Sequence, residues 1–279
     1  DRDDQSWETA LPGFGRTFPH NWGPADSKYY TTFLTLSPAG DEITVDFAKT
    51  LMDAEQVGAD DVTDYLSVSL SSTDYVGHIF GPSSLEAEDN FARLDRSIAD
   101  LLKHVDDTVG LENTLIVLSA DHGAPEHPDY LATLGIEAGL FDFQRVETEP
   151  GFVRLQRDSG ASGDLIANFS NPYLYLNQDL IAQKGLDPVA VEHAISDELR
   201  KLPGIAYAVG SSALREGSFP RSKITDAVLA NFHSERSGDI YVVFEPHWFV
   251  ADFDGLTVAS AHGSPWTYDT HVPLIFSGP

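Results

Sequence analysis

Two segments in the first 110 residues repeat apolar residues with the period of an amphipathic helix. The first helix is predicted over residues 41–57, where a capping Asp41 precedes the apolar positions Ile43, Phe47, Leu51 and Ala54. The second is predicted to begin with a capping box of Ser83 and Glu86 and to end at Gly110. Its apolar stripe comprises Phe91, Leu94, Ile98, Leu101 and Val105.

Short runs rich in β-branched and apolar residues lie on either side of the second helix. Residues 65–70 (YLSVSL) and residues 114–119 (TLIVLS) are predicted to be buried strands. A strand, a helix of this length and a second strand are typical of a right-handed crossover between parallel strands. We therefore predict an α/β fold, a three-layer sandwich with a mostly parallel central sheet.

The chain changes character after residue 145, where shorter apolar segments alternate with turns. The predicted strands of this region cover residues 171–176, 204–209 and 238–250. A helix is predicted to follow the cap-and-first-turn pair Asp187 and Pro188. We predict an α/β core over residues 1–145, a smaller α+β insertion over 146–258, and a return to the core over 259–279.

Charge is the unusual quantity in the composition. The 279 residues include 44 acidic and 17 basic side chains, which gives a formal net charge of −27 at pH 7. A surface this acidic repels nucleic acid and anionic membranes, so neither is an expected partner. The excess is spread along the chain and predicts a solvated surface. A salt-rich habitat and cation binding are two compatible reasons for it.

The chain contains no Cys, which excludes disulfides and thiolate ligands. A transition metal would therefore have to be held by His and carboxylate side chains. There is no apolar run of about 18 residues, so we expect no membrane span. The sequence begins without an initiator Met and ends on the apolar run HVPLIFSGP. We expect both ends to be cut from a longer protein.

Asp and His residues come together in the sequence at three places. Asp74 and His78 lie four residues apart after the first predicted strand. Asp121 and His122 are adjacent after the second strand, and His262 lies near the end. Sites in open α/β sheets form at the carboxyl ends of strands, and imidazole with carboxylate suits Zn²⁺. Each motif alone is equally compatible with a local role, such as an Asp that caps a turn.

Three segments resemble the alkaline phosphatase superfamily: SSTDYVGH at 71–78, SADHG at 119–123, and HGSP with YDTHVP within 262–273. The similarity is greatest to the bacterial alkaline phosphatases that share a core with nucleotide pyrophosphatases and phosphodiesterases. The resemblance extends over most of the chain. It implies two Zn²⁺ ions above a Thr or Ser nucleophile, with Mg²⁺ or Ca²⁺ as a candidate additional ion.

The same resemblance implies a role for each candidate ligand. Asp74, His78 and His262 would hold one zinc ion. Asp121 and His122 would hold the second, together with a further Asp and the nucleophile. Because these last two groups, and the Lys and Arg that contact phosphate, come earlier in relatives, we assign no catalytic residue in this chain. The nucleophile is expected on an upstream segment.

Other polar residues near these motifs have simpler expected roles. Thr73 lies beside Asp74 and is expected to form local hydrogen bonds. Asp269 and His271 are expected to support the ligands through hydrogen bonds rather than to bind metal. His127 and Asp129 are expected on a loop surface. The remaining histidines have no partner pattern and are expected to be structural or exposed: His20, His104, His193, His233 and His247.

These features together predict a zinc-dependent phosphomonoesterase of the alkaline phosphatase type, secreted or periplasmic, that acts on small-molecule phosphate esters through a phospho-enzyme. A phosphodiesterase or nucleotide pyrophosphatase is the alternative enzyme, because it would share the metal ligands. A non-catalytic metal-binding fragment is the alternative from another class, because no nucleophile is assigned. The missing N-terminal segment of the same protein is the expected partner, and an oligomer is an open alternative.

Overall fold

The computed structural model describes residues 3–160, 164–253 and 255–279. The chain divides into two compact units, which we describe one at a time. The first unit comprises Asp1–Tyr130, Ala251–Ala261 and His271–Pro279, and the second comprises Leu131–Val250 and His262–Thr270.

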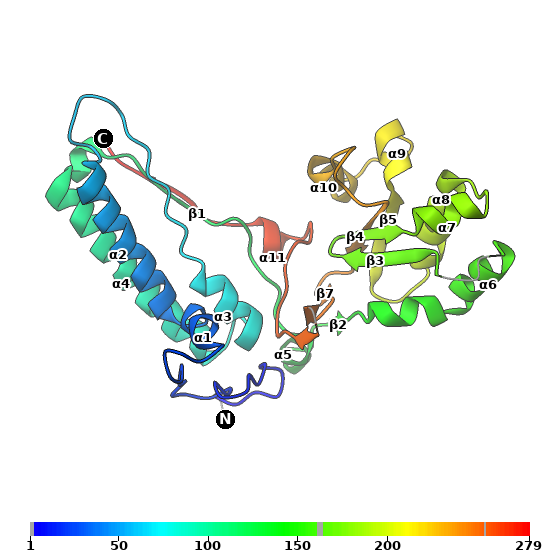
Figure 1. The fold of residues 1–279 in the computed structure, drawn as a ribbon, viewed down its shortest axis with the longest axis horizontal. Helices are drawn as coiled ribbons and strands as arrows, with labels where there is room; N and C mark the ends of the chain where they lie inside the picture. The colour runs from blue at the N-terminus through cyan, green and yellow to red at the C-terminus, as the bar shows by residue number, and fades with distance from the viewer. Residues whose placement is uncertain (1–2, 161–163, 254) are drawn as a thin grey trace. The chain divides into compact units, whose positions relative to one another are not determined.

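The first unit consists mainly of helices, and α2 and α4 pack along each other (Figure 1). Its helices are α1 (Tyr30–Thr35), α2 (Pro38–Glu55), α3 (Ser72–Phe80), α4 (Leu85–Thr108) and the 3-10 helix η1 (Leu111–Asn113). Two strand pairs complete it: β1 (Ile116–Ser119) with β10 (Leu274–Ser277), and β8 (Asp252–Phe253) with β9 (Leu256–Thr257). Both pairs are antiparallel. The short helix α5 (Pro128–Thr133) runs across the division of the chain at Tyr130.

An aromatic core holds the C-terminal end of α3. Phe14 stacks on Phe33 of α1 with ring centroids 4.8 Å apart, and Phe80, the last residue of α3, is completely buried. Full burial of a side chain of this size contributes roughly 1.5–3 kcal/mol. The helix ends there because Gly81 adopts a φ of 96°, which a side chain would disfavour. This core therefore fixes the helix that carries the D-x3-H motif.

The second unit surrounds a four-stranded antiparallel sheet with the strand order β3-β4-β6-β5. The sheet strands are β3 (Ile166–Ser170), β4 (Tyr173–Leu176), β5 (Ile205–Gly210) and β6 (Ile240–Phe244), and a parallel pair is formed by β2 (Gly139–Leu140) and β7 (Trp248–Phe249). The helices are η2 (Phe143–Thr148), α6 (Pro150–Asp158), α7 (Gln178–Gln183), α8 (Pro188–Leu199), α9 (Ser211–Glu216), α10 (Lys223–Asn231) and α11 (Thr267–Thr270).

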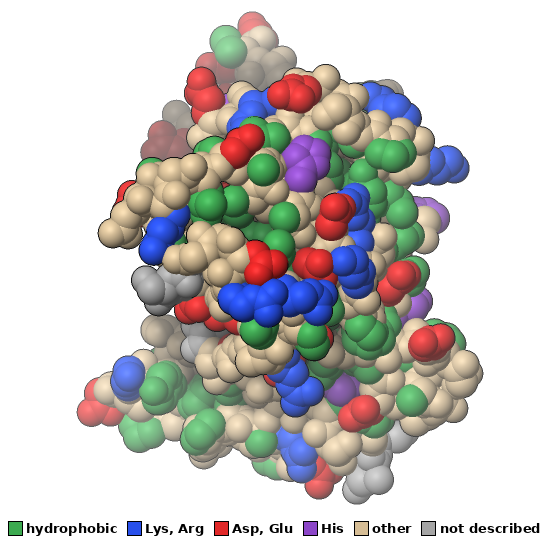
Figure 2. All heavy atoms as spheres, turned by 90° about the vertical axis from the view of Figure 1, so that its right-hand side faces the viewer, with side chains coloured by type: hydrophobic (Ala, Val, Ile, Leu, Met, Phe, Trp, Pro, Cys, Tyr) green, Lys and Arg blue, Asp and Glu red, His purple; other side chains and the backbone are tan. Residues whose placement is uncertain are grey.

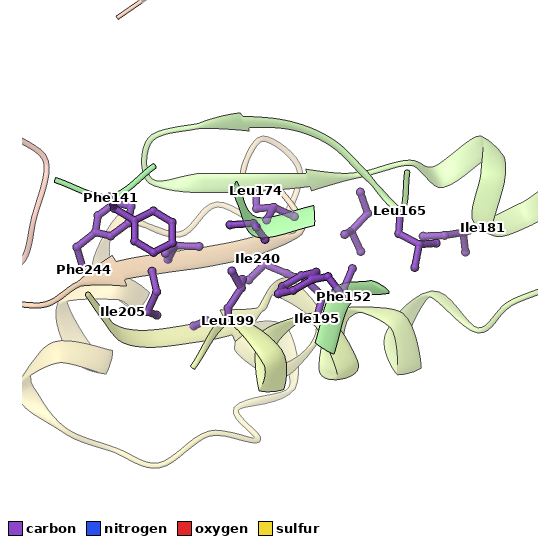
Figure 3. Close-up of a cluster of buried hydrophobic side chains, with 14 residues drawn as sticks. Phe141, Phe152, Leu165, Leu174, Ile181, Ile195, Leu199, Ile205, Ile240 and Phe244 are labelled. Carbon is purple, nitrogen blue, oxygen red and sulfur yellow. The ribbon is translucent and has the colours of Figure 1, made fainter. Parts of the chain in front are cut away.

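Strand β6 is buried along its whole length because both faces of this sheet are covered. Its alternate residues Ile240 and Val242 pack with Ile195 and Leu199 of α8 on one face (Figure 3). On the opposite face, Tyr241 and Val243 pack against apolar residues of α9 and α10. The helix predicted after Asp187 and Pro188 is confirmed, and Asp187 caps it by accepting from the Val189 N–H at 3.0 Å.

The predicted α/β class is confirmed, but the crossover of parallel strands in the first unit is not formed. Residues 65–70 are not a strand and have no sheet partner in the part of the chain that the structure describes. Tyr65 is 91% exposed. The second predicted strand exists as β1, but it pairs antiparallel with β10. A β-rich sequence cannot become a strand without a neighbour that satisfies its backbone groups, so the composition of residues 65–70 was insufficient evidence.

The apolar stripe predicted for α2 lies largely on an exposed face, and the stripe predicted for α4 is only partly buried. In α2 the buried residues include Val45 and Met52, whereas Ile43 and Phe47 are 54% and 68% exposed. In α4, Phe91 is 55% exposed, and the buried positions are mostly polar: Glu86, Asn90 and Ser97, with Ala87 as the apolar exception.

The predicted capping box of α4 is wrong by one residue. Ser84 is the capping residue, and its Oγ accepts a hydrogen bond from the Ala87 N–H at 3.1 Å. Ser83 instead donates from its Oγ to the Glu126 carboxylate at 2.5 Å. Two adjacent serines satisfy the same sequence pattern, so the pattern alone could not select between them.

Basic side chains lie among the acidic ones on part of the surface, although the acidic residues remain in excess. Figure 2 shows Lys and Arg side chains interspersed with Asp and Glu on the face turned to the viewer. Several ion pairs of the second unit join residues close in sequence, for example Lys201 with Glu198 and Arg221 with Asp226. Exposed pairs of this kind contribute about 0–1 kcal/mol each, so they shape the surface more than they stabilise the fold.

Candidate metal centre

The motif Asp74-x-x-x-His78 lies in helix α3. Residues four apart on a helix lie on the same face, one turn from each other. Asp74 is in the first turn of α3 and His78 in the last. The side chains approach each other, with 3.4 Å between His78 Nε2 and Asp74 Oδ2. The helix therefore brings together the two groups that the sequence paired by spacing.

The backbone of the segment 258–261 orients the His78 ring. The Ser260 carbonyl lies 2.7 Å from His78 Nδ1, and a carbonyl can only accept, so Nδ1 carries the proton. The Ala259 N–H also donates to the His78 carbonyl at 2.7 Å. Nε2 is consequently the nitrogen directed at Asp74, and it can bind a proton or a metal ion.

The pKa of His78 indicates that this arrangement favours a positive charge. Burial alone would lower the pKa of the imidazole. Hydrogen bonds with Asp74 and the Ser260 carbonyl, together with the Asp74 charge, outweigh burial and raise the pKa of His78 above its usual value. A nitrogen and a carboxylate oxygen that favour a proton between them are also suited to share a divalent cation.

His262 joins Asp74 and His78 in a group whose potential ligand atoms all lie within 4.8 Å of one another. It directly follows the segment that orients His78. The His262 carbonyl accepts a hydrogen bond from Asn171 Nδ2 at 3.0 Å, and the next residue, Gly263, has a φ of 100°. One carboxylate and two imidazoles fit zinc, whose catalytic sites use three protein ligands and keep a fourth position open.

Asp121 and His122 follow β1 and form a local pair outside this group of three among the described residues. The Gly123 carbonyl lies 3.0 Å from His122 Nδ1, which places the proton there and leaves Nε2 toward Asp121 Oδ2, 3.5 Å away. Asp121 Oδ1 also accepts from the His122 N–H at 3.1 Å. The orientation repeats that of His78, with a backbone carbonyl on Nδ1 and a carboxylate near Nε2.

The remaining predicted residues lie in several environments. Thr73 Oγ1 accepts from Asn90 Nδ2 at 2.9 Å, a local hydrogen bond as expected. Asp269 is buried and accepts from the Ser264 N–H at 2.7 Å, whereas His271 is exposed. His127, predicted on a loop surface, is instead buried and stacks on Trp7 with ring centroids 6.2 Å apart.

Sequence patterns did not reveal the backbone contacts of the site. The groups that orient His78 and His122 are the carbonyls of Ser260 and Gly123, and a carbonyl carries no side-chain signature. Asn171, which holds the His262 carbonyl, lies 91 residues away in sequence and belongs to no recognisable motif.

The described residues form an α/β fold in which Asp74, His78 and His262 make a candidate three-ligand metal centre. A family model described as type I phosphodiesterase / nucleotide pyrophosphatase matches residues 5–271, and the chain belongs to this family, within the alkaline phosphatase superfamily. The predicted superfamily is thereby confirmed.

Individual relatives are similar over nearly the whole of this chain. Alkaline phosphatase PafA from Elizabethkingia meningoseptica is 34% identical over 277 residues, which are 99% of this chain and 50% of that protein. A Myroides odoratus protein named calcium-transporting ATPase is 34% identical over 279 residues, again 99% of this chain and 50% of the relative. The crystal structure of wild-type PafA gives a TM-score of 0.86 at 34% identity, covering 99% of this chain and 52% of that one.

The chain spans about half the length of the curated relatives it matches. The likeness to PafA confirms the alkaline-phosphatase-like α/β fold. Within the described residues, none of the helices has the length and apolar character needed to cross a membrane.

Proposed function

We propose that this chain supplies the zinc-binding part of a two-metal phosphoester hydrolase that cleaves phosphate monoesters through a phospho-enzyme. The observation that carries the proposal is the orientation of His78, whose Nδ1 donates to the Ser260 carbonyl while Nε2 faces Asp74. Metal-binding imidazoles are characteristically oriented by such a hydrogen bond on the other ring nitrogen. The alkaline phosphatase names among the relatives support the same reaction class.

Each candidate ligand has a place in this proposal. Asp74, His78 and His262 would hold one zinc ion, and Asp121 with His122 would contribute to a second. When bound, such ions neutralise phosphate charge, lower the pKa of a hydroxyl nucleophile and stabilise the leaving oxygen. The chain's own contribution is to keep a proton on Nδ1 of His78 and His122, so that Nε2 of each ring stays available to a cation.

We assign the nucleophile and the further Asp ligand to polypeptide outside this sequence. Thr73 is adjacent to Asp74, but its hydroxyl already accepts a hydrogen bond from Asn90. Relatives are about twice as long as this chain, so they contain a segment of similar size that could carry these groups. Asp269, which holds the loop after His262 through Ser264, remains our candidate for supporting that ligand, and His271 is a second candidate.

The apolar surface of the first unit fits such an additional segment. In the described residues β1 and β10 pair with no other strand, so each keeps one open edge. Their side chains are apolar and more than a third exposed: Val117, Leu118, Leu274, Ile275 and Phe276. A two-stranded ribbon is marginal alone in water, and buried parallel sheets have this composition. We propose that strands of the complementary segment pair with this ribbon.

The ribbon should therefore bind a hydrophobic dye when the chain is purified alone. Val117 and Phe276 are directly opposite in the register, and replacing them together, Val117→Glu with Phe276→Lys, puts an ion pair on that face. ANS fluorescence is expected to fall by about half with unchanged far-UV circular dichroism. The control is Val153→Lys, which removes an exposed apolar residue of α6. An equal fall with the control variant would contradict the assignment.

Hydrolysis of paired substrates tests the reaction class. The protein that contains this chain and its complementary segment should, with Zn²⁺, cleave 4-nitrophenyl phosphate at least about tenfold faster than bis(4-nitrophenyl) phosphate. A faster reaction on the diester would favour the alternative, a phosphodiesterase or nucleotide pyrophosphatase. The description of the family supports this alternative. Measured kcat/KM values for both substrates decide between them.

The third candidate function is a non-catalytic metal-binding fragment. Measurement of the intact mass of the purified material distinguishes it from the two enzymes. Material of 30.5 kDa with no companion polypeptide should bind zinc and turn over neither substrate. We further propose a periplasmic or secreted location, for which the absence of Cys and the acidic surface are compatible observations.

A further inference from the structure

Helix α3 receives its N-terminal cap from another helix. Its own capping residue, Ser71, forms no side-chain cap hydrogen bond. Asp41 of α2 replaces it, with Oδ1 accepting from the Ser72 N–H at 3.0 Å. Both Asp41 and Ser72 are only 2% exposed. A carboxylate at this position satisfies one of the open donors of the helix and interacts favourably with the positive end of its dipole.

The next residue of α3 is held from a third helix. Asn90 of α4 is 1% exposed, and its Nδ2 donates to Thr73 Oγ1 at 2.9 Å. Ser72 and Thr73 directly precede Asp74. Two buried polar contacts, one from α2 and one from α4, therefore act on consecutive residues of the turn that carries the first metal ligand.

The approach of α2 to this turn depends on Gly40. A Cβ at position 40 would lie 2.5 Å from Ser72 Oγ, so the Ser72 side chain or the turn that carries it would have to shift. The residue beside the capping carboxylate is thus small enough for Asp41 to reach the α3 backbone. The close contact between α2 and the first turn of α3 therefore involves both Gly40 and Asp41.

The stability that these hydrogen bonds contribute is offset by buried polar atoms that they leave unsatisfied. In the described part of the structure, Asp41 Oδ2 and Asn90 Oδ1 are buried without a hydrogen-bond partner. Burial raises the pKa of Asp41 although the Ser72 N–H opposes the shift. A buried hydrogen bond contributes about 0.5–1.5 kcal/mol, whereas an unsatisfied buried polar atom costs about 1–3 kcal/mol. Stability alone does not explain their presence, and departures of this kind cluster at functional sites.

We propose that Asp41 and Asn90 are positioning residues that fix the rotation and translation of α3, and thereby aim Asp74 and His78 at the metal. The inference rests on the proposed function. Phe80 fixes the far end of the helix by packing, which leaves sliding and rotation about its axis to be limited at the first turn. Buried polar anchors are directional in a way that apolar packing is not, so they can set that rotation.

Zinc affinity of the folded chain tests the role of Asp41, with a chromophoric chelator as competitor. Asp41→Ala should weaken zinc binding about tenfold, as is usual for residues that orient ligands. Asp41→Asn keeps an acceptor for the Ser72 N–H and should stay within about threefold of the wild type. The matched control is Asp187→Ala, which removes the equivalent cap of α8 in the second unit. It should lower stability and leave zinc affinity unchanged.

A zinc-free measurement separates this inference from the proposed function. Proton exchange at His78 Nδ1–H, observed by NMR, reports the hydrogen bond to Ser260. Exchange should accelerate about tenfold in Asp41→Ala and Asn90→Ala, and not in Asp41→Asn or Asp187→Ala. A wild-type chain that binds no zinc would overturn the proposed function alone. Unchanged exchange in folded Asp41→Ala, or equal effects of Asp187→Ala, would overturn the positioning role.

Discussion

Replacement of His78 by Ala is expected to weaken zinc binding to this chain by about 100-fold or more. Loss of a residue that merely orients a ligand typically costs about 10–100-fold in metal affinity, so loss of the ligand itself should cost at least the upper value. His78 Nε2 is the nitrogen aimed at Asp74, and the Ser260 carbonyl prevents the ring from offering Nδ1 instead. Competition with a chromophoric chelator measures the dissociation constant.

The matched control is His193→Ala, which removes an exposed histidine of α8. It should bind zinc with the wild-type dissociation constant, because His193 lies outside the candidate centre. Substitution of Co²⁺ for zinc adds a second readout, since the visible spectrum of Co²⁺ depends on the number and type of its ligands. Wild-type affinity and an unchanged Co²⁺ spectrum in His78→Ala would show that the metal is not held at this helix.

The candidate ligands were predictable from the sequence where local spacing decides the geometry. Asp74 and His78 are one helical turn apart, so any helix through these residues brings the two side chains together. The pairing of Asp121 with His122 likewise follows from adjacency after a strand. In both cases a few neighbouring residues contain the relevant information, and tertiary structure is needed only to hold the segment.

His262 shows where spacing ceases to be informative. It lies 184 residues after His78, and it directly follows Ala259 to Ala261, of which Ala259 and Ser260 bond to His78 through their backbone. The sequence offered a family resemblance for this residue and no physical signal. The same holds for Asp41, which resembled an ordinary capping residue of its own helix and in fact caps α3.

One physical explanation covers two wrong predictions. Residues 65–70 do not form the predicted strand, and the predicted apolar stripes of α2 and α4 are not fully buried. Hydrophobic periodicity states which face of an element is to be buried and gives no information about the partner. Ile43, Phe47 and Phe91 have the spacing of core residues and are more than half exposed here. The pattern was therefore detected correctly, but the surface that would cover it is not among the described residues.

A buried cluster of Glu8, Glu86 and His20 is the basis of the second large expected effect. Glu8 is 3% and Glu86 5% exposed, and His20 Nε2 lies 3.0 Å from Glu86 Oε1. Among the described residues, Glu8 Oε1 and Glu86 Oε2 have no hydrogen-bond partner. Burial, with added repulsion from Glu86 and Asp3, raises the pKa of Glu8 to about 7, against the opposing effects of the Gln5 N–H and Arg16.

The second titratable group of the cluster, His20, acts in the same direction as Glu8. Burial alone would lower the pKa of His20, but its hydrogen bonds with Glu86 and the Phe14 carbonyl raise it above its usual value. The folded state therefore binds more protons than the unfolded state on both Glu8 and His20. Stability contributed by these protons is present at acidic pH and is lost as the pH rises through the folded-state pKa values.

Replacing Glu8 by Gln should remove most of this pH dependence. Between an unfolded value of 4.5 and a folded value of about 7, ionisation of Glu8 costs the folded state about 3 kcal/mol. Gln keeps the acceptor for the Gln5 N–H, which lies 2.9 Å from Glu8 Oε2, and carries no charge. Relative to wild type, Glu8→Gln should therefore gain about 2.5 kcal/mol in unfolding free energy between pH 5 and pH 8, because part of the effect is already present at pH 5.

Equilibrium urea unfolding of both proteins at pH 5 and pH 8 measures this difference, and comparison of the two proteins cancels the titration of all other carboxylates. The control is Glu55→Gln at the exposed end of α2. Its unfolding free energy relative to wild type should be nearly the same at pH 5 and at pH 8. If Glu8→Gln and wild type lose stability in parallel from pH 5 to pH 8, Glu8 is not protonated in the folded chain. The pH dependence would then have to arise from His20 and its hydrogen bond to Glu86.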